Sequence, residues 1–550
     1  MQFEYRYYGE SQVRHDDQGT GISFAPDTLR QPVHFVADIS RHLPFREAIS
    51  ALHDVVVSDL RTKQRDVSAY KAWLAGQEQV MLAEFMAQAS SLRGQVEALS
   101  QQIAEVRTQR VAMQAPYLKA KQRYFNHIYQ HNRDLWFVLD PVITVHPDRV
   151  FFECFSQDES TYANFSCGHE MFSHHGDFAC GTTNIDYSAP LYAEFQKIRQ
   201  YKPTRLTVEP AGFTVQTGVD DGFVEEKIDL PESWVRGFLQ VSAAMALPGR
   251  RLQLHPMDLH NFCLILRWRK ERVGPRSIRF ELVPGQPVKA VFEPWGQEVV
   301  CLRSSHDAPA AESIRIWGRR RLLTLERLTG VAERVQVHLL GTGLPSFWMV
   351  SGADWQYTLG LSGWTANDWS RNGQFDLFGP RQQVDTATQA QVFQALASDY
   401  KATAAQLGLR LGLQPSLVES SLLAYTQAGR VVYDLADGCY RLRELSREPL
   451  PLERLRFCNE REEQASQLVS RGKVKGLSIS ASDAGRQISA QLQDGDRRHG
   501  VTLQIDLDER MAAARCDCDY YVHNKLYRGP CAHILAARMA ADLQARQQRG

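Results

Sequence analysis

The chain has 550 residues, of which 43% are hydrophobic, and its 63 Lys and Arg balance 63 Asp and Glu. This length exceeds what one hydrophobic core usually serves, so we expect three or four domains. A net charge of zero argues against a dedicated nucleic-acid binder, which is normally basic, although a local basic patch stays possible. The chain has no apolar run of about 18 residues, and residues 1–8 lack the charged and apolar regions of a signal peptide, so a cytoplasmic protein is expected.

The first two predicted segments are residues 1–44, which read as short strands and loops, and residues 45–132, which read as long helices. No proline occurs from residue 45 to residue 115, and apolar residues there recur at steps of three and four. This seam consists of Leu82, Phe85, Ala89, Leu92, Val96, Leu99, Ile103 and Val106. The spacing is typical of a coiled coil or a long helical hairpin. The seam could pack on its own chain or engage a partner.

Residues 133–382 are predicted to form a large β-rich region. Apolar runs with strand character occur at 136–139, 149–154, 205–208, 262–266, 335–339 and 346–350. Turn signals such as Pro248-Gly249 and Pro284-Gly285 separate these runs. The pattern does not decide between one sheet domain and two.

The β-rich region also contains arginines with interleaved indoles. They are Arg267, Trp268, Arg269, Lys270, Arg272, Arg276, Arg279, Trp317, Arg319, Arg320 and Arg321. Cations combined with aromatic rings suit neutralisation of a nucleic-acid backbone and stacking of bases. An acidic protein partner would be served equally well, and a charge run on strands is more often a solvated face.

The same region contains candidate ligands for a second metal site. The candidate ligands are Cys154, Cys167, His169, His174, His175, Asp177 and Cys180. No pair of cysteines has the short Cys-x-x-Cys spacing of a zinc ribbon, so loop histidines and buried cysteines are the better interpretation. His169 and His174 are five residues apart, whereas a metalloprotease helix needs an interval of four. Phosphate loops, dinucleotide fingerprints and nucleophile elbows are also missing from the sequence, so no enzyme is predicted.

Residues 383–445 change to a helical pattern that ends in a hairpin. Helices are predicted at 390–397, at 403–411 with Thr403 as its cap, and at 415–428, followed by strands at 430–433 and 438–442. Three helices and a hairpin resemble a winged helix-turn-helix. The third helix contains no Arg or Lys, and Glu419 would face a polyanion. A packing or spacer role is therefore favoured over DNA reading.

Residues 446–550 contain the most specific motif of the chain. Strands are predicted at 473–480, 487–492 and 500–507, and a helix at 531–543 with Pro530 as its first residue. Between them, Cys516, Cys518, Cys531 and His533 have the spacing of metal ligands. Zn²⁺ takes four such ligands tetrahedrally, and a closed set of three Cys and one His leaves no position for water or substrate. The sequence therefore predicts a structural zinc site, against the alternative of four incidental buried residues.

The CxCx12CxH arrangement, with strands before it and a helix after it, resembles the SWIM zinc finger over about residues 457–543. The whole layout resembles bacterial SWIM proteins, some of which look like accessory subunits encoded beside MoxR-type ATPases and von Willebrand A-domain proteins. The resemblance implies an adaptor, and SWIM fingers are associated with protein or DNA binding. We therefore expect a multidomain α+β, zinc-binding, non-enzymatic interaction protein. The alternative is a DNA-binding protein that uses the finger, the winged helix and the basic centre.

Overall fold

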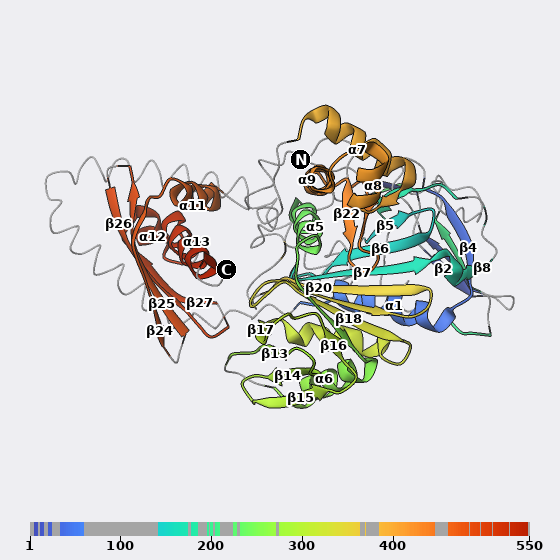
Figure 1. Ribbon diagram of the computed structural model, residues 1–550, viewed down its shortest axis with the longest axis horizontal. Helices are drawn as coiled ribbons and strands as arrows, with labels where there is room; N and C mark the ends of the chain where they lie inside the picture. The colour runs from blue at the N-terminus through green and yellow to red at the C-terminus, as the bar shows by residue number, and fades with distance from the viewer. Residues whose placement is uncertain are drawn as a thin grey trace, which may run out of the picture. The chain divides into compact units, whose positions relative to one another are not determined.

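The computed structural model describes the chain in several stretches, which together contain helices and several sheets (Figure 1). They are residues 5–8, 12–15, 20–24, 33–59, 141–173, 176, 178–184, 195–196, 198–201, 204–208, 224–227, 232–270, 274–363, 369, 384–445, 460–482, 485–495, 497–508, 510–526 and 529–547. The chain divides into two compact units, one of which is Leu60–Val138. That unit, and with it the predicted seam from Leu82 to Val106, lies outside the described residues. None of the described helices combines the length and the apolar character needed to cross a membrane.

The N-terminal strands predicted from the sequence are present, and they pair with strands far along the chain. They are β1 (Tyr5–Tyr8), β2 (Gln12–His15), β3 (Thr20–Phe24) and β4 (Phe35–Ile39). Together with β8 (Phe172–Ser173) and β10 (Thr204–Val208), three of them form a five-stranded sheet in the order β2-β3-β10-β4-β8, in which β3 and β10 run parallel. The remaining strand, β1, pairs with β11 (Val224–Lys227).

A nine-stranded antiparallel sheet forms the centre, with helices on both faces (Figure 1). Its order is β16 (Ser305–His306), β12 (Arg250–Leu254), β18 (Arg334–Leu339), β19 (Ser346–Ser351), β20 (Trp355–Leu361), β7 (Thr161–Gly168), β6 (Arg149–Phe155), β5 (Val142–Val145) and β9 (Gly181–Asn184). On one face, Phe152 and Phe165 pack in the same core as α1 (His42–Val56). On the other, Phe155 and Tyr162 pack with α5 (Glu232–Met245). Because both faces are buried, strands such as β6 and β19 are buried along nearly their whole length and are rich in apolar residues.

A second sheet shares the core with α1. It has four strands in the order β15 (Gln297–Cys301), β14 (Val288–Phe292), β13 (Ile278–Leu282) and β17 (Glu312–Ile316), and the 3-10 helix η3 (Arg319–Leu328) follows it. The region predicted to be rich in β structure therefore contains more than one sheet.

One predicted strand is wrong, because residues 262–266 lie inside the helix α6 (Pro256–Trp268). The helix start is encoded just upstream: the Met257 N–H donates to His255 Nδ1 (3.1 Å), and the His255 N–H donates to Asp258 (2.9 Å). Pro256 follows as the first helical residue, where its missing N–H costs nothing. An apolar run of five residues is compatible with a strand or a buried helix, and the cap decides between them.

The helices and hairpin predicted for residues 383–445 are present. They are α7 (Thr386–Asp399), α8 (Ala404–Leu411), α9 (Pro415–Gln427), β22 (Val431–Asp434) and β23 (Cys439–Leu442). Thr403 caps α8 in a capping box with Gln406, as predicted. A short strand that was not predicted, β21 (Lys401–Ala402), pairs with β23.

The C-terminal elements enclose their own core. They are α11 (Glu460–Ser470), β24 (Val474–Ser482), β25 (Gly485–Asp494), β26 (Arg497–Ile505), β27 (Met511–Cys516), α12 (Asp519–Asn524) and α13 (Ala532–Gln547). Alternate residues of the sheet, including Ile488, Val501 and Leu503, pack with Ile534 of α13. Strand β27 and helix α12 were not predicted. The last helix begins at Ala532, so Pro530 precedes it and is not its first residue.

Candidate metal centre

The structure brings together the four residues that the sequence predicts as metal ligands. Cys516 ends β27, and Cys518 is the N-cap of α12, where its Sγ accepts a hydrogen bond from the Tyr521 N–H (3.5 Å). Cys531 immediately precedes α13, and His533 lies in its first turn. All four side chains are buried, and their ligand atoms lie within 4.8 Å of one another.

The donor set and its spacing fit a zinc ion. Cys516 Sγ lies 3.8 Å from His533 Nδ1. In a tetrahedral site the usual Zn–S and Zn–N bond lengths place two such atoms about 3.6 Å apart. The protein itself supplies all four ligands, and a closed set of this kind is typical of structural zinc and not of catalytic zinc.

The electrostatics of the cluster favour a bound cation. Hydrogen bonding from Cys516, together with that from His533 and against the effect of burial, lowers the pKa of the Cys531 thiol to about 4. The same hydrogen bond to Cys531, followed by burial, raises the pKa of Cys516, and burial raises that of Cys518. Negative charge is thus favoured on Cys531, and a bound metal ion would displace the protons of the other two thiols.

Asp494 and His499 belong to the surroundings of the centre, and sequence reasoning did not identify them. His533 Nε2 lies 3.3 Å from Asp494 Oδ2, and the His499 ring lies 4.3 Å from the His533 ring, centroid to centroid. Asp494 is 39 residues away from His533 in the chain, so no local spacing connects them. The only signal was their position between the predicted strands 487–492 and 500–507, which precede the first two ligands.

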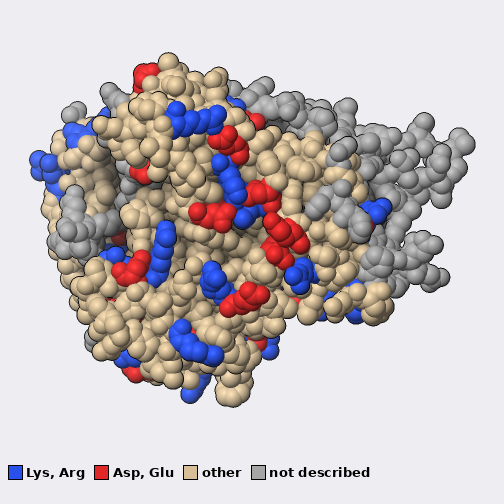
Figure 2. All heavy atoms as spheres, turned by 45° about the vertical axis from the view of Figure 1, so that its right-hand side comes forward, with Lys and Arg blue, Asp and Glu red and all other residues tan. Residues whose placement is uncertain are grey.

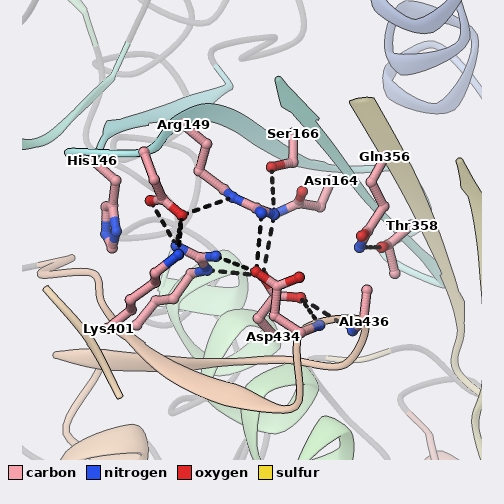
Figure 3. Close-up of polar contacts among 12 residues, drawn as sticks. His146, Arg149, Asn164, Ser166, Gln356, Thr358, Lys401, Asp434 and Ala436 are labelled. Atoms are coloured by element: carbon pink, nitrogen blue, oxygen red, sulfur yellow. Dashed lines mark hydrogen bonds and ion pairs between the residues drawn. The ribbon is translucent and has the colours of Figure 1, made fainter. Parts of the chain in front are cut away.

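Among the described residues, one other group has metal-binding side chains close together: Asp434, Asp437 and Cys439. The two carboxylates of this group already form ion pairs with arginines of the protein (Figure 3). Asp434 Oδ2 accepts from Arg441 Nε (2.8 Å) and Arg149 Nη1 (3.4 Å), and Asp437 Oδ2 accepts from both of these arginines (2.6 and 2.9 Å). This group is therefore an ion-pair network that joins the β22–β23 hairpin to β6.

The hollow beside this network is small. It is lined by residues that include Arg149, Tyr162, Gln356 and Tyr433, and its volume is about 30 Å³. A water molecule fits such a space, whereas organic ligands occupy roughly ten times that volume or more.

The second metal site weighed from the sequence does not assemble among the described residues. Cys154 is buried in β6, where its thiol donates to the Leu52 carbonyl (3.8 Å), and Cys167 is buried in β7. Neither of them, nor His169 or Cys180, belongs to a group of described residues that could hold a metal. His174, His175 and Asp177 lie outside the described residues.

Most arginines of the predicted basic centre are bound by acceptors of the protein. Arg319 is 1% exposed and donates to the carbonyls of Ser277 and Glu293. Four other arginines form ion pairs: Arg321 with Asp158, Arg279 with Glu281 and Glu293, Arg276 with Asp508, and Arg267 with Glu326. Arg320 donates to the Leu266 carbonyl (3.1 Å), and Arg272 lies outside the described residues. In the part of the chain that the structure describes, Arg269 and Lys270 are exposed without an ion pair, next to Trp268, which is 79% exposed. Figure 2 shows basic and acidic side chains side by side over one face.

Three comparisons with known proteins bear on this centre. Proliferating cellular nuclear antigen from Entamoeba histolytica aligns over 41% of this chain and 89% of its own, with 10% identity and a TM-score of 0.29, which is too low to indicate a shared fold. No curated protein matches. Residues 501–538, which contain all four clustered ligands, match the SWIM zinc finger family. The chain therefore carries a SWIM zinc finger in which Cys516, Cys518, Cys531 and His533 form the buried metal-binding cluster.

Proposed function

We propose that this protein is a zinc-binding, non-enzymatic adaptor whose SWIM finger docks protein partners. The observation that carries the proposal is the closed metal-binding cluster, in which four buried side chains fill every position of a tetrahedral ion. Zinc held in this way stabilises a fold and its surface, and no position is left for a substrate or an activated water.

We further propose that residues 383–445 are a winged helix-turn-helix used for packing. The element order α7, β21, α8, α9, β22 and β23 supports this assignment. Helix α9, which would read DNA, also packs on α5, and most of its other residues are buried or half-buried, with Pro415 and Glu419 exposed. Arg441 of the hairpin that would form the wing binds Asp148 (2.9 Å), and Arg443, just after the hairpin, binds Glu153 (3.1 Å). Both parts of such a module that would contact DNA thus take part in contacts within the chain itself.

The candidate partners are a MoxR-type ATPase and a von Willebrand A-domain protein, which are proposed from the resemblance of the layout alone. The long helical segment is a second docking element in this proposal. Its described part, α1, buries Phe45 and Leu52 in the core, so docking would fall to residues 60–132, outside the described residues.

Affinity purification at native salt, with and without nuclease and followed by mass spectrometry, tests the proposal. We expect the same protein partners with and without nuclease, and their loss in a Cys516→Ser/Cys518→Ser variant. Cys180→Ser, which changes a thiol outside the cluster, is the matched control and should keep them. If the protein partners are no longer recovered after nuclease treatment, the result would instead support the nucleic-acid alternative and overturn the adaptor proposal.

A further inference from the structure

We propose that Asp494 is the positioning residue of the metal centre: it holds the proton of His533 on Nε2, so that the ring binds the metal through Nδ1. This inference rests on the proposed binding of zinc by the finger. It goes beyond the four ligands because it assigns the coordinating atom and the carboxylate that selects it.

The two ring nitrogens of His533 face different partners. Nδ1 lies on the side of the thiols, 3.8 Å from Cys516 Sγ, and Nε2 lies 3.3 Å from Asp494 Oδ2. A neutral imidazole carries one N–H, and its other nitrogen offers a lone pair. An ionised carboxylate can only accept a hydrogen bond, so the nitrogen that faces Asp494 must carry the proton. The lone pair is then on Nδ1, where the metal would be.

The fold places this carboxylate through the β25–β26 hairpin. Asp494 is the last residue of β25 and lies opposite Arg497 of β26 in the strand register. Gly495 follows it and takes the left-handed backbone conformation (φ +58°) that the turn requires. The hairpin end therefore carries the carboxylate to the ring of His533, in the first turn of α13.

The neighbouring carboxylate, Asp517, cannot take this role, although it stands between two of the ligands in the chain. Its Oδ1 accepts from His499 Nδ1 (2.7 Å), and its Oδ2 accepts from the Gly500 N–H (3.0 Å). The His499 ring in turn lies against the His533 ring, tilted by 33°. Asp517 thus orients the His499 ring, which lies against His533, whereas Asp494 orients His533, the metal ligand.

The test uses the full chain loaded with zinc, compared as wild type, Asp494→Ala, Asp494→Asn and Asp519→Ala. Asp519 is the matched control because it is another exposed acid near the site, and it pairs with Arg497 and with none of the ligands. Replacing the hydrogen-bond partner of a metal-binding histidine typically weakens metal binding by about 10- to 100-fold. Because the Asp494 side chain is 60% exposed, we expect the lower end, about tenfold weaker zinc binding for Asp494→Ala in competition with a chelator. Asp494→Asn should recover part of this loss, since its amide oxygen still accepts, and Asp519→Ala should bind zinc as tightly as the wild type.

A second readout reports the tautomer directly. In the zinc-loaded chain with nitrogen-15 histidine, long-range proton–nitrogen correlations should show His533 metal-bound at Nδ1 and protonated at Nε2, with assignment by a His533→Gln variant. Protonation at Nδ1 instead, or equal zinc affinity of Asp494→Ala and Asp519→Ala, would overturn the inference while leaving zinc binding intact. A wild-type chain that binds no zinc would overturn the proposed metal centre and this inference together.

Discussion

The thiols of Cys516, Cys518 and Cys531 lie in the core that joins the finger sheet to α13. Replacing Cys516 and Cys518 by Ser should abolish zinc binding and unfold the C-terminal region while the core of the nine-stranded sheet stays folded. Structural zinc contributes on the order of 10 kcal/mol in small finger peptides, more than the core of so small a domain can replace. Metal analysis and far-UV circular dichroism of the purified chain check both effects. Equal zinc content in wild type and variant would show that the ligands lie elsewhere.

A fully buried ion pair attaches the segment after β23 to the central sheet. Arg443 is 0% exposed and donates to both oxygens of Glu153 (3.1 and 3.2 Å) and to Ser242, and Tyr162 donates to the same carboxylate (2.7 Å). Arg443→Met would leave Glu153 charged and buried, at a cost of about 3–5 kcal/mol. We expect a clear fall in melting temperature.

Two control variants distinguish this loss from a general effect of removing an arginine. Arg410→Met removes a half-exposed pair with Asp399, whose contribution to stability is typically about 0–1 kcal/mol, and should change the melting temperature little. The double variant Arg443→Met/Glu153→Leu should recover much of the loss, because no uncompensated charge remains. A single Arg443→Met variant as stable as Arg410→Met would contradict the prediction.

Local spacing explains which of these residues could be identified from the sequence. The four clustered ligands lie within eighteen residues, and the chemistry of thiol and imidazole makes their pattern specific. By contrast, Arg443 and Glu153 are 290 residues apart, and Asp494 and His533 are 39 apart. Nothing short of the folded sheet brings such pairs together, so their roles could not be predicted.

At the scale of elements, caps and turn residues were more informative than apolar runs. Thr403 predicted the start of α8, because a threonine side chain can cap the free N–H groups of the first turn. The run 262–266 was read as a strand, although His255, Pro256 and Asp258 upstream formed the start of a helix. Strand β27 was missed because Met511–Cys516 is rich in alanine, a residue that sheets disfavour; its pairing with β26 overrides that propensity.

The link between β5 and the hairpin should make stability depend on pH. His146 follows β5 and is 1% exposed; its Nε2–H donates to the Leu442 carbonyl at the end of β23 (2.6 Å). Burial, against the effect of this hydrogen bond, lowers the pKa of His146 to about 4. The ring is therefore neutral in the fold near pH 7. Since the pKa is depressed, its contribution is present above the unfolded value of about 6.5 and is lost as the pH falls toward 4, in total about 3 kcal/mol.

Melting temperatures measured between pH 7 and pH 4.5 test this expectation. His146→Gln keeps a neutral donor for the Leu442 carbonyl and cannot gain a proton, so its melting temperature should fall less steeply with acid. Some slope should remain, because burial also lowers the pKa of His53 to about 4. Identical slopes in wild type and His146→Gln would show that His146 is not protonated in this range.

At the scale of the whole molecule, the total charge is zero, and many individual charges are also balanced locally by ion pairs. The 63 cationic residues equal the 63 anionic ones, and four arginines of the predicted basic centre are paired with carboxylates of the same chain. A phosphate backbone would have to displace those carboxylates before it could be neutralised. These paired arginines are thus poorly placed to neutralise a nucleic-acid backbone.

The full chain should accordingly bind duplex DNA no more tightly than about 1 µM at physiological salt, the strong end of non-specific binding. Fluorescence anisotropy of labelled duplexes between 50 and 200 mM salt measures the affinity and its salt dependence. Arg269 and Lys270, which are exposed just after α6, would contact phosphates in any residual binding. Arg269→Ala/Lys270→Ala should therefore reduce the salt slope by about two, roughly one per phosphate contact. A complex near 10 nM that prefers one sequence would contradict the expectation, because such affinity requires base contacts and many neutralised phosphates.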